Sequence, residues 1–303
     1  MSAGPQEAEL TPPPNLHLPD SFGGRPSLRE RVEQKYFVAP GKAGWALALL
    51  RTTCRWDDQY PAEQINSLYF DTTHLDQHER SLAGEFGKDK VRIRWYGDEH
   101  DPHRTSSRPE RPPAPPASPR VQVWLELKSR RGLISTKQRT VAEVQADALA
   151  FASLARGIVA VGTLMQTMAG FGFFAAGRLC PVIAVSYWRY RFVEPRTGFR
   201  VSLDSHIRSS MVMPGIGHGE RGLELPGAVI EVKGPSLDVP LCLRPVAEIG
   251  SSWTRYSKYS SSLEAHMSDM GTVSRLWPSG TMYTEPCTTV PQTNREVAEC
   301  GRS

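Results

Sequence analysis

Cysteine is scarce in this sequence, and no cysteine has a close partner along the chain. The five cysteines are scattered, their total is odd, and no Cys-x-x-Cys pair occurs. They are Cys54, Cys180, Cys242, Cys287 and Cys300. This pattern argues against a zinc ribbon and against a disulfide-stapled scaffold, and it fits a reducing compartment. We therefore expect a cytoplasmic protein.

The chain also lacks a secretory signal and an obvious membrane span. Residues 1–20 are acidic and proline-rich, with no basic region followed by an apolar run. The segment Gly157–Gly177 carries no charge, but four glycines, Thr163, Gln166 and Thr167 interrupt it. A buried or lid-forming helical segment is the favoured interpretation and a membrane contact stays open, but we expect no stable membrane insertion.

The net charge is small for a chain of this size. The 303 residues carry a formal net charge of +4, which is too little to coat nucleic acid, so anion recognition needs locally concentrated cations. The length suits one large domain or two small ones, and no repeat of solenoid length occurs. We expect a disordered proline-rich tail at 1–27, an ordered domain at 28–267 with an exposed proline-rich loop at 100–120, and a disordered tail at 268–303.

The ordered part is rich in the alternation typical of strands. Counting with a period of two predicts eight strands. They are Arg31–Val38, Ile65–Asp71, Lys90–Tyr96, Val121–Ser129, Ser135–Thr140, Val182–Val193, Phe199–Asp204 and Val229–Lys233. Helical spacing predicts helices over Lys42–Thr53, Val141–Arg156, part of the segment after Gly157, and Trp253–Met267. Strands dominate and helices are inserted between them, so the fold class is α+β with an antiparallel sheet or barrel at its centre.

The octet Lys90-Val-Arg-Ile-Arg-Trp-Tyr-Gly97 shows this alternation most clearly. Successive side chains of a strand point to opposite faces, so Lys90, Arg92 and Arg94 share one face and the apolar residues between them share the other. Seven of the eight predicted strands have one face that holds cations or carboxylates. The repetition makes the pattern informative, because any single strand of this kind is ordinary.

Two interpretations of these charged faces compete. A sheet with one solvated face and cross-strand ion pairs explains any single strand. It explains the whole set less well, because solvated faces usually mix Lys, Glu, Thr, Ser and Gln, whereas these faces favour arginine and repeat Glu-x-Lys. The repeated pairs are Glu33/Lys35, Glu126/Lys128 and Glu231/Lys233. We therefore predict an eight-stranded antiparallel β-barrel tunnel with a charged interior, wrapped by helices that pack on its apolar outer face.

A tunnel lined by arginine and lysine would bind a polyanion. The planar arginine fork suits phosphate oxygens, and low-dielectric walls strengthen each contact. Cations greatly outnumber carboxylates on these faces, so the ligand should carry several negative charges in a row. The carboxylates either neutralise adjacent cations or hold a divalent ion that bridges phosphate oxygens, and Glu231 is the best metal candidate among them.

Eight short motifs occur in order between about Arg31 and Leu263. They are Lys35-Tyr-Phe-Val38, Ser67-Leu-Tyr-Phe-Asp71, the octet above, Trp124-Leu-Glu-Leu-Lys128, Tyr187-Trp-Arg189, Arg200-Val-Ser-Leu-Asp204, Val229-Ile-Glu-Val-Lys233 and Tyr256-Ser-Lys-Tyr259. In number and order they resemble the vacuolar transporter chaperone (VTC) domain. That domain is the polyphosphate polymerase branch of the CYTH-like triphosphate tunnel metalloenzymes.

The resemblance implies an eight-stranded antiparallel tunnel and the transfer of the ATP γ-phosphate onto a polyphosphate chain, dependent on Mn²⁺ or Mg²⁺. By the same resemblance the catalytic phosphate-binding cations would be Lys35, Arg92, Arg94, Arg189 and Arg200. Phosphate or polyphosphate would also be bound by Lys128, Arg139, Ser257 and Lys258, and the metal by Glu231. ATP and polyphosphate are thus the expected partners, and nucleic acid is not expected.

Two departures from the family pattern bear on function. Hydrolytic relatives begin with a Glu-x-Glu-x-Lys strand, whereas this strand reads Arg31-Val-Glu33-Gln-Lys35, which favours the polymerase branch. Eukaryotic members carry an N-terminal regulatory helical domain and C-terminal membrane helices, for which this chain has no room, so we expect a stand-alone soluble form. Two alternatives stay open. One is a tunnel-type hydrolase of triphosphate or nucleoside triphosphates, and the other is a non-enzymatic polyphosphate- or RNA-binding module in which Trp95, Trp124, Trp188 and Tyr190 stack bases.

Overall fold

A computed structural model gives the fold of residues 32–97, 119–132, 134–213, 222–252 and 256–268. The predicted tails and most of the predicted proline-rich loop lie outside these described residues. Within them, eleven strands form one antiparallel sheet. The strands are β1 Val32–Val38, β2 Arg55–Trp56, β3 Ala62–Asp71, β4 Gly87–Tyr96, β5 Arg120–Arg131, β6 Ile134–Gln145, β7 Cys180–Val193, β8 Arg200–Met211, β9 Leu223–Leu225, β10 Ala228–Gly234 and β11 Gly250–Ser252.

Helices flank this sheet. They are α1 Ala43–Thr53, α2 Asp76–Leu82, α3 Phe151–Leu154, α4 Val161–Gly170, α5 Pro245–Ile249 and α6 Lys258–Met267, with 3-10 turns η1 Ala146–Leu149 and η2 Leu241–Leu243. All eight predicted strands are present, as β1, β3, β4, β5, β6, β7, β8 and β10. The α+β class is therefore confirmed.

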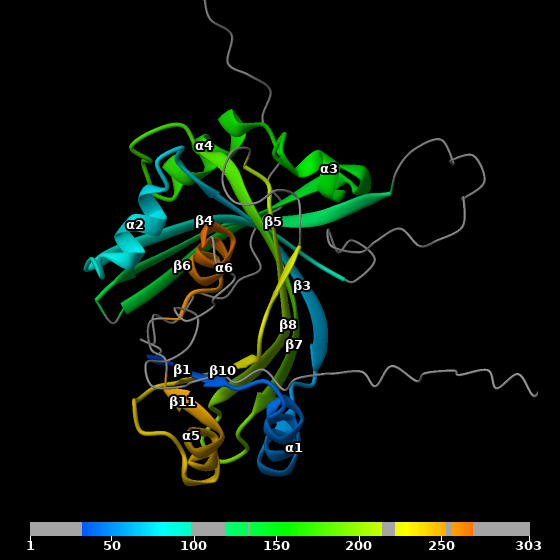
Figure 1. The fold of residues 1–303 in the computed structure, drawn as a ribbon, viewed down its shortest axis with the longest axis vertical. Coiled ribbons are helices and arrows are strands. Elements are labelled where there is room, and N and C mark those ends of the chain that lie inside the picture. Colours follow the sequence, from blue (N-terminus) through cyan, green and yellow to red (C-terminus); the bar gives the residue numbers. More distant parts are fainter. Residues whose placement is uncertain (1–31, 98–118, 133, 214–221, 253–255, 269–303) are drawn as a thin grey trace, which may run out of the picture.

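The sheet bends strongly but does not close. Its strand order is β11-β1-β10-β8-β7-β3-β4-β5-β6, and no ladder joins the two ends within the described residues. The predicted closed barrel is therefore not confirmed. β3, β7 and β8 connect a part that holds β4–β6 to a part that holds β1 and β10, so the sheet curls around a concave face (Figure 1). Register shifts between Tyr69 and Phe70 and between Ser186 and Trp188 lie in these connecting strands, and such irregularities increase bending.

The two faces of the sheet differ in chemistry as the alternation predicted. The apolar residues of β4 and β5 pack with Leu154 of α3 and with Leu164 and Met168 of α4. On the other side of the molecule, Leu50 of α1 and Val246 of α5 pack on the apolar residues of β1, β8 and β10. Helices α1, α3, α4 and α5 thus cover the outer, convex face. On the concave face, α6 packs through Tyr259 and Leu263 on a third apolar cluster that includes Tyr69 and Tyr187, and the charged side chains gather beside this cluster.

One predicted helix is wrong in its first part, and another is shorter than expected. Val141–Arg156 was expected to be helical, but β6 continues to Gln145 because it pairs with β5 as far as Arg120. The rest of the predicted segment contains the short helical elements η1 and α3. The helix predicted from Trp253 begins at Lys258, and the Ser257 side chain caps it by accepting a hydrogen bond from the Ser260 backbone N–H. The α6 N-terminus is thereby fixed against the concave face.

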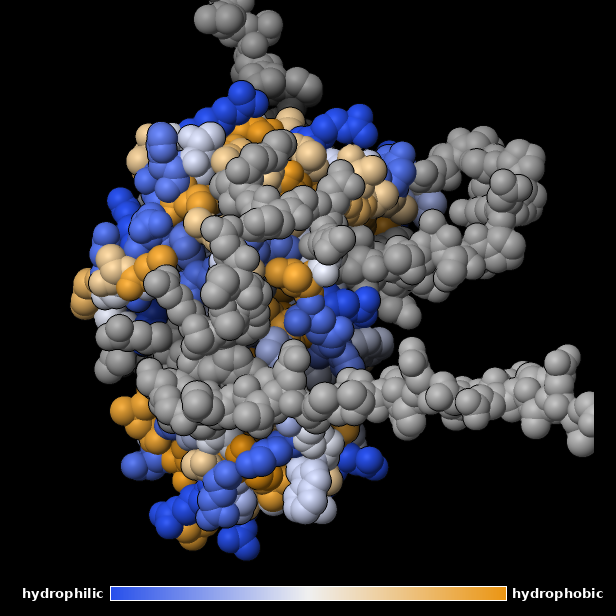
Figure 2. All heavy atoms as spheres, in the orientation of Figure 1, coloured by the Kyte–Doolittle hydropathy of each residue, from blue (hydrophilic) through white to orange (hydrophobic). Residues whose placement is uncertain are grey.

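The uncharged segment Gly157–Gly177 contains α4, whose buried side chains belong to the apolar core described above. α4 is ten residues long and packs on the core through Leu164 and Met168. Across the described part of the chain, the helices are all too short or too polar to traverse a lipid bilayer. The described residues on the face shown in Figure 2 mix hydrophilic and hydrophobic side chains.

Candidate phosphate-binding site

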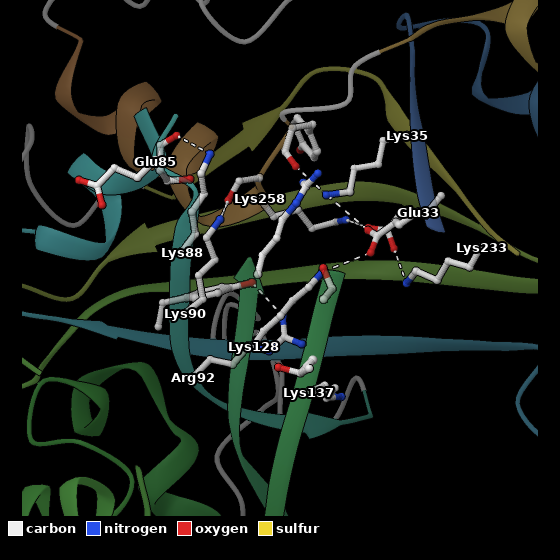
Figure 3. A pocket seen from close by; sticks show the side chains of 18 of the residues that line it. Glu33, Lys35, Glu85, Lys88, Lys90, Arg92, Lys128, Lys137, Lys233 and Lys258 are labelled. Carbon is white, nitrogen blue, oxygen red and sulfur yellow. Dashed lines mark hydrogen bonds and ion pairs between the residues drawn. The ribbon is translucent and has the colours of Figure 1, made fainter. Parts of the chain in front are cut away.

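The concave face encloses a cavity of about 860 Å³ whose lining is dominated by cations. We call it the cation cavity. Eleven of its lining residues are lysine or arginine, and three are glutamate. The cations are Lys35, Lys88, Lys90, Arg92, Arg94, Lys128, Arg130, Lys137, Arg189, Lys233 and Lys258. Figure 3 shows labelled members of this set converging from several strands and from α6.

Strand alternation and register bring these side chains together. Lys88, Lys90, Arg92 and Arg94 occupy every second position of β4, so they project from the same face. On β5, Lys128 lies directly opposite Lys90, and residues directly opposite in an antiparallel pair share a face. The predicted convergence of cations from separate strands is confirmed.

A buried ion-pair network forms one wall of the cavity. Arg189 donates two hydrogen bonds of 2.6 Å to the two oxygens of Asp204 and a third of 3.1 Å to Glu231. Lys258 lies 2.5 Å from Asp204 and 3.2 Å from Glu231, and Lys233 donates to Glu231 at 3.0 Å. Burial alone would raise the pKa of Glu231, but Lys233, Lys258 and Arg189 outweigh it and hold the pKa well below its usual value. The carboxylates therefore stay ionised and fix the cations in place.

A second network surrounds Glu126, which is fully buried on β5. Arg92 pairs with this carboxylate at 2.7 Å, Arg94 lies 4.0 Å away, and Lys137 also contacts it. Burial alone would raise the pKa of Glu126, but these three cations lower it to about 2. Arg94 also donates to the hydroxyl of Tyr187 at 3.2 Å. Two arginines are thus held rigidly side by side.

The third carboxylate network links β1 with β5. Glu33 lies 3.4 Å from Lys35 and 3.3 Å from Lys128. Burial and Glu231 would raise the pKa of Glu33, but Lys233, Lys35 and Lys128 lower it to about 2. Lys35 donates at 2.8 Å to the backbone carbonyl of Tyr256, which ties β1 to the chain that leads into α6.

Three lysines of the lining hold their protons weakly. Burial, reinforced by Arg94 and Arg92, lowers the pKa of Lys137 to about 7 even though Glu126 lies beside it. Lys90 donates to the Ser257 hydroxyl oxygen at 2.6 Å. Burial, reinforced by Lys35, Lys128 and other nearby cations, lowers its pKa well below the usual lysine value. Burial also lowers the pKa of Lys128, to about 8, since Lys35 and Lys233 offset the help it receives from Glu33. A bound anion would relieve this crowding of positive charge.

Most of the site residues predicted from sequence meet in the cation cavity. These residues are Lys35, Arg92, Arg94, Lys128, Arg189, Glu231, Ser257 and Lys258. Arg139 and Arg200 are not among the lining residues, and both are exposed. Arg139 lies opposite Glu126 on the last strand of the sheet, and Arg200 lies opposite Lys233 at the start of β8.

Several lining cations had no predicted site role. They are Lys88, Lys90, Arg130, Lys137 and Lys233. Each shares a strand face with a predicted residue, so the alternation that marked Arg92 or Lys128 also marks these positions. The sequence also predicted that Asp204 and Glu126 lie on charged strand faces. It did not predict that Asp204 pairs with two cations and Glu126 with three, because these contacts depend on how the strands pair.

The metal question turns on Glu231. Within the described residues no group of three or more His, Cys, Asp or Glu side chains is placed to hold a metal ion. A phosphate-bridging Mg²⁺ or Mn²⁺ needs only one or two protein carboxylates, because water and phosphate oxygens complete its coordination. Glu231 lines the cavity, and its carboxylate accepts hydrogen bonds from Lys258, Arg189 and Lys233. A metal ion at Glu231 would therefore need phosphate and water oxygens as its other ligands.

Comparison with known proteins identifies the family. The VTC domain matches residues 30–267, which include all the described strands and all but the last residue of the described part of the chain. The chain belongs to the VTC domain family. No curated protein matches it.

The VTC domain chain is also similar to two solved structures. A protein from Vibrio parahaemolyticus titled a "putative adenylate cyclase" is 11% identical over 72% of this chain and 83% of its own, with a TM-score of 0.31. A protein from Bacillus halodurans with the same printed description is 14% identical over 68% of this chain and 83% of its own, with a TM-score of 0.39.

Proposed function

We propose that this VTC domain chain is an ATP-dependent polyphosphate polymerase that transfers the γ-phosphate of ATP to a polyphosphate chain in the cation cavity. The observation that carries the proposal is the surplus of positive charge around one cavity, where eleven lining cations face five carboxylates, namely three lining glutamates and the buried Glu126 and Asp204 that pair with lining cations. A single phosphate would leave most of this surplus without a counter-charge, whereas a run of phosphates would match it.

The shape of the lining supports a long ligand. Along β4, alternate positions from Lys88 to Arg94 all line the cavity. At a rise of about 3.4 Å per residue, these four side chains span roughly 20 Å. The cavity volume of about 860 Å³ lies toward the upper end of the range for small-molecule sites. Nucleotide phosphates and an acceptor phosphate therefore have room to meet inside.

The fixed arginines supply what phosphoryl transfer needs. The transition state spreads negative charge over the transferred phosphate, so positioning and electrostatic stabilisation provide most of the rate. Arg92, Arg94 and Arg189 are already held by Glu126, Tyr187 and Asp204, so little reorganisation is required when charge develops. We assign Lys35 and Arg200 to nucleotide phosphates as well, Arg200 from outside the cavity. The acceptor or emerging chain is assigned to Lys128, Arg139, Ser257 and Lys258.

We assign the metal to Glu231, with Mn²⁺ or Mg²⁺ as the ion. Such an ion, when bound, neutralises phosphate oxygens and orients them for in-line attack. Lys233, Lys258 and Arg189 keep the Glu231 carboxylate ionised whether or not phosphate is present. ATP and polyphosphate are the proposed partners, and the cysteine pattern leads us to place the activity in the cytoplasm.

The RNA-binding alternative receives little support from the positions of its aromatic residues. Trp95 is completely buried on the convex side, and Trp124 packs edge-on against Tyr96. Among the described residues, the lining of the cation cavity includes none of the four aromatic residues proposed to stack bases.

The product of the reaction tests the proposal. The protein is incubated with ATP and Mn²⁺, and the products are separated by gel electrophoresis and assayed for free phosphate. A ladder of long phosphate chains is expected, and Glu231→Gln should abolish it. Arg156→Ala, an exposed change outside the cavity, is the matched control. Free phosphate as the main product would identify a triphosphatase, and tight polyphosphate binding without turnover would identify a binding module.

A further inference from the structure

An exposed phenyl ring stands at one mouth of the cation cavity. Phe86 precedes β4 directly, lines the cavity, and is 74% exposed. In Figure 3, Glu85 and Lys88 lie on one side of the cavity, and Glu33 and Lys233 lie on the opposite side. Phe86 lies between Glu85 and Lys88 in sequence and so belongs to the first of these two ends. Single exposed apolar side chains are common on protein surfaces, so the informative feature of Phe86 is its place in the lining of the cation cavity.

The backbone holds this ring in place. The Phe86 carbonyl oxygen accepts a hydrogen bond of 2.9 Å from the backbone N–H of Gly132, in the turn between β5 and β6. Gly132 has a φ of +58°, and a Cβ atom at that position would lie only 2.7 Å from Cε2 of the ring. Glycine therefore allows both the left-handed turn and the close approach of the ring. The ring is seated on the turn on one side while most of its surface faces solvent.

The other aromatic rings of the lining are already engaged. Tyr69 stacks on Tyr259 at a centroid separation of 5.1 Å. Tyr187 has the Arg189 guanidinium 5.4 Å and the Lys258 ammonium 4.8 Å from its ring centroid. The remaining ring, that of Tyr256, is only 5% exposed. Among the described lining residues, Phe86 is the aromatic side chain whose surface is open to an incoming planar group.

Charged side chains of the lining follow this ring along the chain. Glu85 directly precedes Phe86 and pairs with Arg80 at 3.8 Å, and Arg130 donates a hydrogen bond of 2.8 Å to the backbone carbonyl of Gly132. Lys88, Lys90 and Arg92 then occupy alternate positions of β4, and all three line the cavity. Alternate positions of a strand lie roughly 7 Å apart. An apolar platform followed by a row of cations matches a ligand with a planar base at one end and a row of phosphates behind it.

We infer that Phe86 stacks on the base of the nucleoside triphosphate, which enters with its base at the α2 end and its phosphates directed along β4. The γ-phosphate would then point toward Arg92 and Arg94. This inference rests on the proposed function, because it assumes that a nucleotide is the phosphate donor. It adds a source of discrimination between nucleotides and inorganic triphosphates that the cations alone cannot provide.

Calorimetric titration with two probes tests the inference. ATP and inorganic tripolyphosphate are titrated separately into the wild-type protein, Phe86→Ala and Phe174→Ala. Phe174 is 80% exposed and is not among the cavity-lining residues, so it is the matched control. Stacking of a base on one aromatic side chain corresponds to a change of roughly 5- to 160-fold in affinity. We expect Phe86→Ala to weaken ATP by that factor and to leave tripolyphosphate binding unchanged, while Phe174→Ala changes neither.

A second variant separates stacking from simple filling of space. Phe86→Leu keeps an apolar side chain over Gly132 but has no π-face, so it should weaken ATP nearly as much as Phe86→Ala. Phe86→Trp keeps an aromatic face and should bind ATP about as tightly as the wild-type protein does. Equal weakening of both probes, or no change for ATP, would overturn the inference. Failure of the wild-type protein to bind tripolyphosphate would instead overturn the proposed function, so the two failures are distinguishable.

Discussion

Replacement of Arg94 by alanine separates catalysis from folding more cleanly than any other change in the cavity. Its side chain is 7% exposed and donates to the Tyr187 hydroxyl at 3.2 Å and to Ser67 at 3.3 Å. Its nearest carboxylate, Glu126, is 4.0 Å away and keeps Arg92 and Lys137 as partners. The change therefore leaves no buried charge unpaired, and we expect it to destabilise the fold by only about 1–2 kcal/mol.

The loss of activity should be much larger than the loss of stability. Removing one preorganised donor to developing negative charge costs about 2–4 kcal/mol of transition-state stabilisation. That range corresponds to a fall in kcat of roughly 30- to 900-fold. Arg94→Lys should recover part of it, since it restores the charge but not the planar fork.

The assay is ADP release from ATP and Mn²⁺ in the presence of a polyphosphate primer, with urea unfolding measured in parallel. Arg156→Ala serves as the control for the loss of an arginine outside the cavity. An Arg94→Ala protein with wild-type turnover would remove this residue from the reaction. A protein that loses activity only in proportion to its loss of stability would also refute the reasoning.

Three further predictions concern the carboxylates and the weakly protonated lysines. Asp204→Asn leaves Arg189 and Lys258 short of a buried partner, so urea unfolding should show a loss of about 3–5 kcal/mol, and a loss below 1 kcal/mol would contradict this. Glu231→Gln should show no turnover at any Mn²⁺ concentration in a metal titration while tripolyphosphate still binds, and Mn²⁺ activation like that of the wild-type protein would count against the metal assignment. Lys128 has a pKa of about 8, so calorimetry should show tripolyphosphate affinity falling as the pH rises from 7 to 9. Lys128→Arg keeps its charge throughout that range and should reduce this pH dependence without abolishing it, because the pKa values of Lys137 and Lys90 are also lowered. A wild-type affinity that is independent of pH would refute the electrostatic argument.

Alternation along the chain predicted the faces of the strands well, because side-chain direction in a strand has a strict period of two. Lys90, Arg92 and Arg94 do share a face, and Trp95 is buried on the other. Alternation does not predict, however, which side chains on a strand face reach the cavity. Lys137 and Arg139 share a face of β6, yet only Lys137 lines the cavity, since depth depends on how far each strand extends past its neighbours.

Longer-range features were harder to predict. Val141–Gln145 has apolar residues at both helical and strand spacing, and its pairing with β5 decides the outcome. Closure of the barrel would require the two ends of the sheet, β11 and β6, to pair with each other. These strands are distant in sequence and carry no local signal for such pairing. The role of Phe86 was missed for a similar reason, because only the turn at Gly132 brings the ring to the cavity mouth.

Because the sheet is open, β6 is an edge strand. This position offers a reason for the charge of Arg139, which does not line the cavity. Unpaired edge strands tend to add a strand from another molecule, and charged side chains on the edge oppose such association. Lys137 and Arg139 are both exposed on β6. Addition of a second copy of β6 there would bring two sets of these cations together, so we expect Arg139 to oppose such association whatever its part in guiding a phosphate chain.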